Sequence, residues 1–114
     1  MIDNNNIISI CFRNINSIKI SSLKKLLDKL TSSTVLRSFT FSDNHNSSGF
    51  DEGWRIIINF IENNKSLRNI NISMSFLYDK YLENLCNSLK GKKISTLNLS
   101  SNFISFNGAK KIAN

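Results

Sequence analysis

The sequence has no proline, four glycines, two cysteines and one histidine among its 114 residues. Two cysteines are too few for the disulfide framework of a small secreted domain, and their spacing is not that of a zinc site. No apolar run approaches the roughly 18 residues that a membrane-spanning helix needs. The first ten residues carry no basic leader before an apolar stretch. We therefore expect a cytoplasmic protein with no membrane segment.

Groups for catalysis are also scarce. The only histidine, His45, lies in the polar stretch SDNHNSSG, with Asp43 and Ser47 nearby. A catalytic group needs a pocket and a positioned base, and a surface loop of this composition offers neither. Gly49 and Gly53 are not followed by the G-K-[ST] signature of a phosphate-binding loop. We expect no enzyme, no cofactor and no metal site.

Acidic residues are outnumbered, with eight Asp and Glu against 15 Lys and Arg and a net charge of +7. A basic balance can indicate a nucleic-acid or anionic-membrane partner. Here 11 of the 15 cations are lysines spread along the chain. Asn, Ser, Ile and Lys together make up 63 residues, a bias typical of AT-rich genomes. Part of the charge is therefore compositional, and we rank nucleic acid below protein as a partner.

The motif apolar-x-x-apolar-x-apolar occurs four times, with starts separated by 29, 31 and 27 residues. Its copies begin at Ile7, Leu36, Leu67 and Ile94. The last two apolar positions of each copy alternate with polar ones, which is typical of a β-strand. The motif predicts strands near 7–12, 36–42, 67–73 and 94–100 in one parallel sheet.

A second periodicity follows each copy. Apolar residues at i, i+3, i+4 and i+7 begin at Leu23, Trp54 and Leu82, and a fourth set starts at Ala109 before the sequence stops. This spacing forms the apolar stripe of an amphipathic helix. Asp51 and Asp79 precede two of the stripes, where we expect them to cap helix N-termini. The alternation of strand and helix indicates an α/β fold.

Gly91 follows the third helical stripe and is surrounded by Lys90, Lys92 and Lys93. Glycine in this place favours a left-handed helix end. The three lysines could form an anion site, or they could be cations that complement the C-terminal end of a helix dipole. We favour the second interpretation.

The segment ISTLNLSSNFISFNGAKKIAN resembles a leucine-rich repeat of the ribonuclease-inhibitor type. The residues that fill its LxxLxLxxNxI core are Ile94, Leu97, Leu99, Asn102 and Ile104. In the other copies the Asn position holds Asn44, Ser75 and Ile15. The Asn follows the strand where the chain turns, and its side-chain amide can satisfy backbone groups there. The resemblance implies a right-handed α/β leucine-rich-repeat solenoid, with parallel strands on the concave face and helices on the convex face, in about 3.5–4 repeats.

We expect one domain over residues 1–114. The predicted repeats span about 7–35, 36–66, 67–93 and 94–114, and the last is incomplete. Open ends of stacked repeats generally need a polar capping unit. We therefore predict that the natural protein continues at the C-terminal end, or that this end self-associates.

Strand alternation places the residues between the apolar positions on the concave face. That face should be polar and nearly free of acids, with Arg37 and Arg68 side by side. Such a surface suits a protein or peptide partner, and an acidic one in particular. The residues expected to bind it are Arg13, Arg37, Thr40, Arg68, Asn69, Asn71, Thr96 and Asn98. Ile56 and Phe60 are candidates for a separate apolar patch on the outer helices.

The leading functional prediction is a protein-interaction module that binds a partner on its concave face. Short polar side chains that only keep an open sheet soluble are the competing interpretation of that face. A first alternative function is a regulator or activator of a small GTPase, because the scaffold resembles that of the Ran GTPase-activating protein. Residues 42–53 contain no arginine that could be inserted into a GTPase site. A basic nucleic-acid-binding module is the second alternative.

Overall fold

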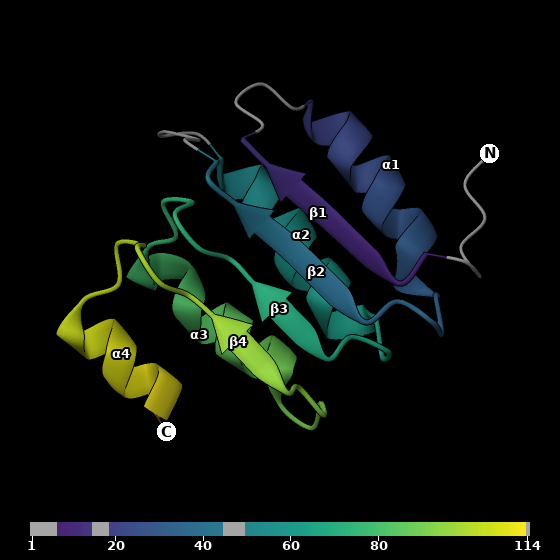
Figure 1. The fold of residues 1–114 in the computed structure, drawn as a ribbon. Helices are drawn as coiled ribbons and strands as arrows, with labels where there is room; N and C mark the ends of the chain where they lie inside the picture. Colours follow the sequence, from purple (N-terminus) through teal and green to yellow (C-terminus); the bar gives the residue numbers. More distant parts are fainter. Residues whose placement is uncertain (1–6, 15–18, 45–49, 114) are drawn as a thin grey trace.

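The computed structural model describes residues 7–14, 19–44 and 50–113, and strands alternate with helices along the whole of this chain (Figure 1). The elements are β1 (Ser9–Arg13), α1 (Ile20–Thr31), β2 (Ser38–Ser42), α2 (Asp51–Asn63), β3 (Asn69–Asn71), α3 (Asp79–Leu89), β4 (Thr96–Asn98) and α4 (Phe106–Ala113). His45, Ser47, Gly49 and Ile15, which the sequence analysis singled out, lie outside the described residues.

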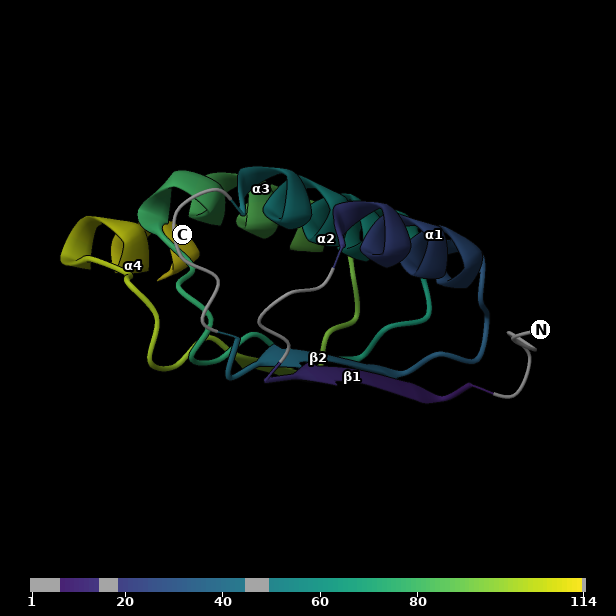
Figure 2. The ribbon, with the colours of Figure 1, turned by 90° about the horizontal axis from the view of Figure 1, so that it is seen from above.

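The four strands form one parallel sheet in the order β1-β2-β3-β4. Ile10, Phe39, Ile70 and Leu97 lie side by side across it. The helices cover one face of the sheet and leave the other open, so the molecule has two layers (Figure 2). The predicted α/β class and the four parallel strands are confirmed.

The core lies between the two layers and is built from the two periodicities of the sequence. Phe39, Phe41 and Ile70 point from the sheet toward the helices and are at most 1% exposed. The ring of Phe60 on α2 lies 5.4 Å from that of Phe39. Trp54 lies 5.5 Å from Phe41. Burial of each such side chain contributes about 1.5–3 kcal/mol. A single strand–helix unit could not bury its apolar side chains by itself, so the units must stack.

None of the helices in the described part of the chain is long and apolar enough to cross a membrane. Each of the first three has one buried stripe, such as Leu23, Leu27 and Leu30 on α1. This is the helical periodicity expected from the sequence.

Asp51 and Asp79 do not cap helices, contrary to the prediction. Each is the first residue inside its helix, and neither α2 nor α3 has a side-chain cap. Both carboxylates instead reach the following unit. Asp51 accepts a hydrogen bond from the hydroxyl of Tyr81 and lies 3.3 Å from Nζ of Lys80, and Asp79 accepts one from the backbone amide of Ser105 at 2.9 Å. These acids therefore tie neighbouring units together.

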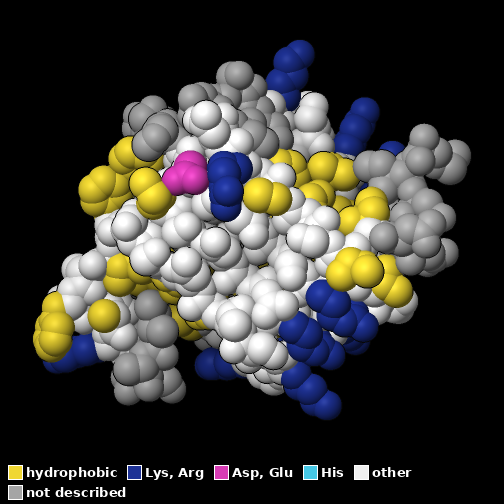
Figure 3. Space-filling model, in the orientation of Figure 1, with side chains coloured by type: hydrophobic (Ala, Val, Ile, Leu, Met, Phe, Trp, Pro, Cys, Tyr) yellow, Lys and Arg dark blue, Asp and Glu magenta, His cyan; other side chains and the backbone are white. Residues whose placement is uncertain are grey.

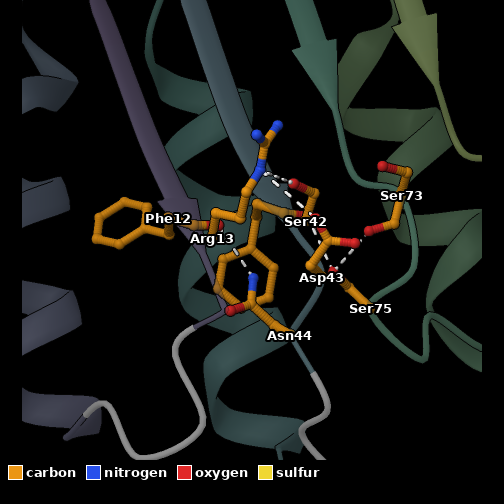
Figure 4. A network of polar contacts seen from close by, with 8 residues as sticks. Phe12, Arg13, Ser42, Asp43, Asn44, Ser73 and Ser75 are labelled. Atoms are coloured by element: carbon orange, nitrogen blue, oxygen red, sulfur yellow. Dashed lines mark hydrogen bonds and ion pairs between the residues drawn. The ribbon is translucent and has the colours of Figure 1, made fainter.

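The turns after β2, β3 and β4 are each closed by a side chain that reaches back to the previous strand unit. The amide of Asn44 donates to the carbonyl of Phe12 at 3.1 Å, the hydroxyl of Ser75 to Phe41 at 3.0 Å, and the amide of Asn102 to Ile72 at 2.5 Å. Figure 4 shows the first of these contacts. The interpretation of the Asn position as a group that satisfies turn carbonyls is confirmed.

Each of these three side chains follows a residue with a left-handed backbone, and Asn14 after β1 has the same conformation. Asn14, Asp43, Met74 and Ser101 have φ between +51° and +56°. Asn and Asp tolerate this conformation, whereas other residues with a Cβ pay about 1–2 kcal/mol. The repeated turn is thus one conformation imposed on four different residues.

Asn64 forms a second connection between units, near the N-terminal ends of the strands. It is fully buried. Its amide donates to the carbonyl of Leu30 at 2.9 Å, while its Oδ1 accepts the backbone amides of Ser66 and Leu67 at 2.9 and 3.0 Å. One side chain therefore joins the end of α1 to the segment that enters β3.

The two cysteines lie in different layers, and both are free. Cys11 is exposed on β1. Cys86 on α3 is partly buried. This burial raises the pKa of its thiol, and the nearby Lys90 opposes the shift.

Replacement of Asn64 by Ala should lower the free energy of unfolding by at least about 2 kcal/mol, because it leaves two amide donors buried without acceptors. Asn63→Ala is the matched control, since Asn63 is exposed and its amide reaches only Asn59 on the same helix. Urea denaturation of both variants measures the difference. An equal decrease in the free energy of unfolding in both variants would contradict a stabilising role for the hydrogen bonds of Asn64.

Candidate protein-interaction surface

The open face of the sheet is lined by the polar strand residues that point away from the helices. Thr40, Asn69 and Asn71 are half-buried there, whereas Thr96 and Asn98 are exposed. Asn69 connects its neighbours, because its amide donates to the hydroxyl of Ser38 at 3.4 Å and its Oδ1 accepts from Thr96 at 2.8 Å. Hydrogen bonds thus run across β2, β3 and β4 on this face.

Asn71 differs from the other members of this face. Its Oδ1 is buried and has no hydrogen-bond partner among the described residues. A buried acceptor without a donor costs about 1–3 kcal/mol. It marks the middle of the open face as a place where a donor would be stabilising.

Arg13 lies at the end of β1 beside an acid. Its Nε is 3.3 Å from the hydroxyl of Ser42 and 3.5 Å from Oδ2 of Asp43 (Figure 4). Both charged side chains are partly exposed, at 60% and 38%, so the pair contributes little to stability. The sequence analysis expected almost no acid on this face, and Asp43 corrects that expectation at this corner.

Arg37 and Arg68 directly precede β2 and β3, so they lie on neighbouring segments of the chain. The backbone amide of Arg68 donates to the carbonyl of Arg37 at 2.9 Å. Nη1 of Arg37 donates to the carbonyl of Thr34 at 3.0 Å, and Nη1 of Arg68 to that of Leu67 at 2.9 Å. A guanidinium has five N–H groups, and the hydrogen bonds of these two side chains in the described part of the chain use only Nη1. The other donors can meet a partner.

Basic side chains gather at one edge of the open face, where β3 and β4 begin (Figure 3). The middle of the face is uncharged. The predicted contact residues therefore occupy three places: Arg13 at the end of the strands, Arg37 and Arg68 at their beginning, and the Asn and Thr residues between.

The predicted outer patch is not an exposed surface. Phe60 is 1% exposed and packs on Phe39, and Ile56 is half-buried against the core. The angular position of Phe60 on its helix suggested a flank, but α1 and α3 both pack against α2 and cover its sides. Phe60 is a core residue.

An aromatic corner, made of Met74, Phe76, Tyr78 and Phe103, lies on the turns after β3 and β4 and was missed by the sequence analysis. The ring of Phe103 lies 5.1 Å from that of Phe76 and 5.2 Å from that of Tyr78. Met74, Tyr78 and Phe103 are 47%, 45% and 54% exposed. Met74, Phe76 and Phe103, with Ser101, line a hollow of about 140 Å³. Exposed, stacked aromatic side chains are typical of protein-binding surfaces.

The backbone beneath this corner is strained. Met74, Phe76 and Ser101 all have positive φ, at 51°, 57° and 56°. Oδ1 of Asn102 holds the turn by accepting the amides of Ser75 and Leu77, at 2.9 and 3.0 Å. Strain that the surrounding structure maintains is frequent at functional sites. A sequence signal did exist, because Met74, Phe76 and Phe103 are large apolar residues outside both periodicities.

The described residues contain no group of three His, Cys, Asp or Glu side chains that could hold a metal ion. His45 lies outside them, so the structure adds nothing on that residue.

Solved structures share this fold, including the following two. The actin-binding site 2 (ABS2) of leiomodin-1 superposes with a TM-score of 0.75 at 16% identity, over 92% of this chain and 61% of that one. A Caenorhabditis elegans tropomodulin C-terminal domain superposes with a TM-score of 0.70 at 18% identity, over 97% of this chain and 83% of that one. The chain thus spans less than two thirds of the leiomodin-1 chain. The sequence matches no family model and no curated protein.

The assignment to leucine-rich repeats of the ribonuclease-inhibitor type is therefore wrong. The two structures described above are leiomodin and tropomodulin domains, and the chain forms a small α/β fold with a four-stranded parallel sheet rather than a leucine-rich-repeat solenoid. Any stack of strand–helix units produces the same two periodicities, so the spacing indicates the class and not the family. The turn Asn that supported the resemblance occurs in only two of the four copies, at Asn44 and Asn102.

Replacement of Ser101 by Gly should raise the free energy of unfolding by about 1 kcal/mol, because glycine adopts its φ of 56° without a steric cost. Ser100→Gly is the control, since the neighbouring Ser100 is exposed and its φ is not positive. Thermal and urea unfolding of the two variants should move in opposite directions. A Ser101→Gly variant less stable than the original protein would contradict the left-handed turn.

Proposed function

We propose that this chain is a protein-interaction domain that binds a partner protein with its open sheet face and the aromatic corner. The observation that carries the proposal is the corner itself, in which Phe103 stacks on Tyr78 and lies beside the tilted ring of Phe76 while remaining 54% exposed. Large side chains in this state lose apolar surface to water when a partner covers them.

The open face would contribute the polar part of the interface. Its Asn and Thr side chains carry both donors and acceptors, which suit the backbone and polar side chains of a bound protein. Arg37 and Arg68 would add charge-assisted hydrogen bonds to carboxylates, so acidic segments are favoured. The turns of the aromatic corner directly follow β3 and β4, so one partner could cover both regions.

Actin is the first partner to test, because the leiomodin-1 structure with this fold is an actin-binding site. The alternative of a small-GTPase regulator finds no support in the comparisons. Nucleic-acid binding is ranked below protein binding, since the open face is uncharged in its middle. We propose that residues 1–114 act as one domain.

Self-association through the last unit stays a separate prediction. Leu97 on β4 and Phe106 on α4 are 37% and 74% exposed. A second copy that covers them would appear as a concentration-dependent dimer in analytical ultracentrifugation.

Replacement of Phe103 by Ser should weaken binding to actin at least tenfold, which corresponds to about 1.4 kcal/mol. The side chain is half exposed, so the fold should survive, as circular dichroism can verify. Ile8→Ser is the matched control, because Ile8 is 61% exposed beside the first strand, at the opposite edge of the sheet. Cosedimentation with filaments and calorimetry with monomeric actin measure the affinity.

The double variant Arg37→Ser with Arg68→Ser tests the open face in the same assays. A tenfold loss in this variant and in Phe103→Ser supports one continuous interface. Actin binding that neither variant changes would contradict the proposed surface, and no binding by the original chain would exclude actin as the partner.

A further inference from the structure

A hollow of about 430 Å³ lies between the C-terminal ends of α2 and α3, at the edge where β3 and β4 begin. Five cations and one carboxylate line it: Lys65, Arg68, Lys90, Lys92, Lys93 and Glu62. Figure 3 shows basic side chains gathered at this end of the strands. This arrangement brings together the lysines around Gly91 with two cations from the preceding unit.

These cations lack the acids that accompany others in the chain. Lys24 lies 2.8 Å from Asp28, and Lys80 lies 3.3 Å from Asp51. Among the described residues, no carboxylate forms an ion pair with any of the five cations of the hollow. The hollow therefore concentrates positive charge that the chain itself does not neutralise.

Lys92 is affected both by burial and by a neighbouring cation. Its pKa is lowered, first by burial and then by the charge of Lys65, while Glu62 acts in the opposite direction. Its ammonium is held by one hydrogen bond to the carbonyl of Asn64, at 2.6 Å. A bound anion would favour the charged ammonium and so offset both unfavourable effects.

The interpretation that these lysines only complement helix ends accounts for part of the cluster. Lys92 binds the carbonyl of Asn64, just beyond α2, and Arg68 binds the carbonyl of Leu67. The ends of the two helices are otherwise closed by backbone amides, which reach the carbonyls of Phe60 and Leu89 at 2.9 and 3.2 Å. Hydrogen bonds to helix-end carbonyls thus account for only Lys92 among the five cations, because Leu67 lies beyond the end of α2.

We propose that this hollow binds a compact ligand with two or more phosphate groups. Five cations in one place exceed what a single carboxylate would need, and Arg68 can form forked hydrogen bonds to phosphate oxygens. The volume lies in the range of small-molecule sites, about 300–1,000 Å³. A nucleic-acid surface would spread its cations along a stripe rather than converge them on one hollow. The sequence alone favoured a role for the three lysines at the helix end. Lys65 and Arg68 from the preceding unit line the same hollow, and their presence favours an anion site instead.

Pyrophosphate is the probe, measured by isothermal titration calorimetry at constant ionic strength. We expect saturable binding of one pyrophosphate per chain. The double variant Lys65→Gln with Lys92→Gln should weaken it at least tenfold. Lys19→Gln with Lys25→Gln is the control, because it removes the same charge from the region of α1 and should change the affinity less than twofold.

A second double variant, Lys90→Gln with Lys93→Gln, protects the test against a folding defect, because no hydrogen bond of either side chain is found in the described residues. It should also lose at least tenfold. No saturable binding by the original chain would overturn the proposal, as would equal losses in the control and the hollow variants. Tighter binding of a duplex oligonucleotide, unaffected by both hollow variants, would also overturn it. The assay contains no partner protein, so its outcome is independent of the proposed interface.

Discussion

The fold depends on one repeated contact, a polar side chain that closes each turn by bonding to the strand before it. Asn44, Ser75 and Asn102 make this contact for three successive turns. The carbonyls that accept these bonds lie at the ends of strands, where the ladder of the sheet stops and leaves them in need of a donor. Each contact therefore fixes the left-handed residue before it and aligns one unit with the next.

The two ends of the strands carry different kinds of side chain, aromatic at one end and basic at the other. The turns after the strands are tightly held, and those after β3 and β4 carry the strained aromatic corner. The segments before the strands carry the cations, several of which bind backbone carbonyls there. Because the hydrogen bonds of Asn102 hold these turns, Phe103 is stacked yet exposed, and a partner would meet a preformed surface at a small entropic cost.

The strands, the helices and the role of the turn Asn could be predicted because periodicity and turn chemistry are local. The family could not, since stacked strand–helix units in any family share that pattern. Asp51 and Asp79 resembled caps because sequence shows proximity to a helix start but not the neighbouring unit that each one bonds. The aromatic corner and the basic hollow each combine residues from two units, and the burial of Phe60 depends on its neighbours. Such contacts exist only after stacking.

Amide hydrogen exchange in an Asn102→Ala variant tests this account most directly. The amides of Ser75 and Leu77 both donate to Oδ1 of Asn102. The account predicts that they lose protection by at least about tenfold, while the amides of Ser66 and Leu67, which donate to Asn64, keep theirs. Such a result would place the loss at the turn that carries the aromatic corner. Unchanged protection at Ser75 and Leu77, or an equal loss at all four amides, would contradict the claim that this side chain holds its turn.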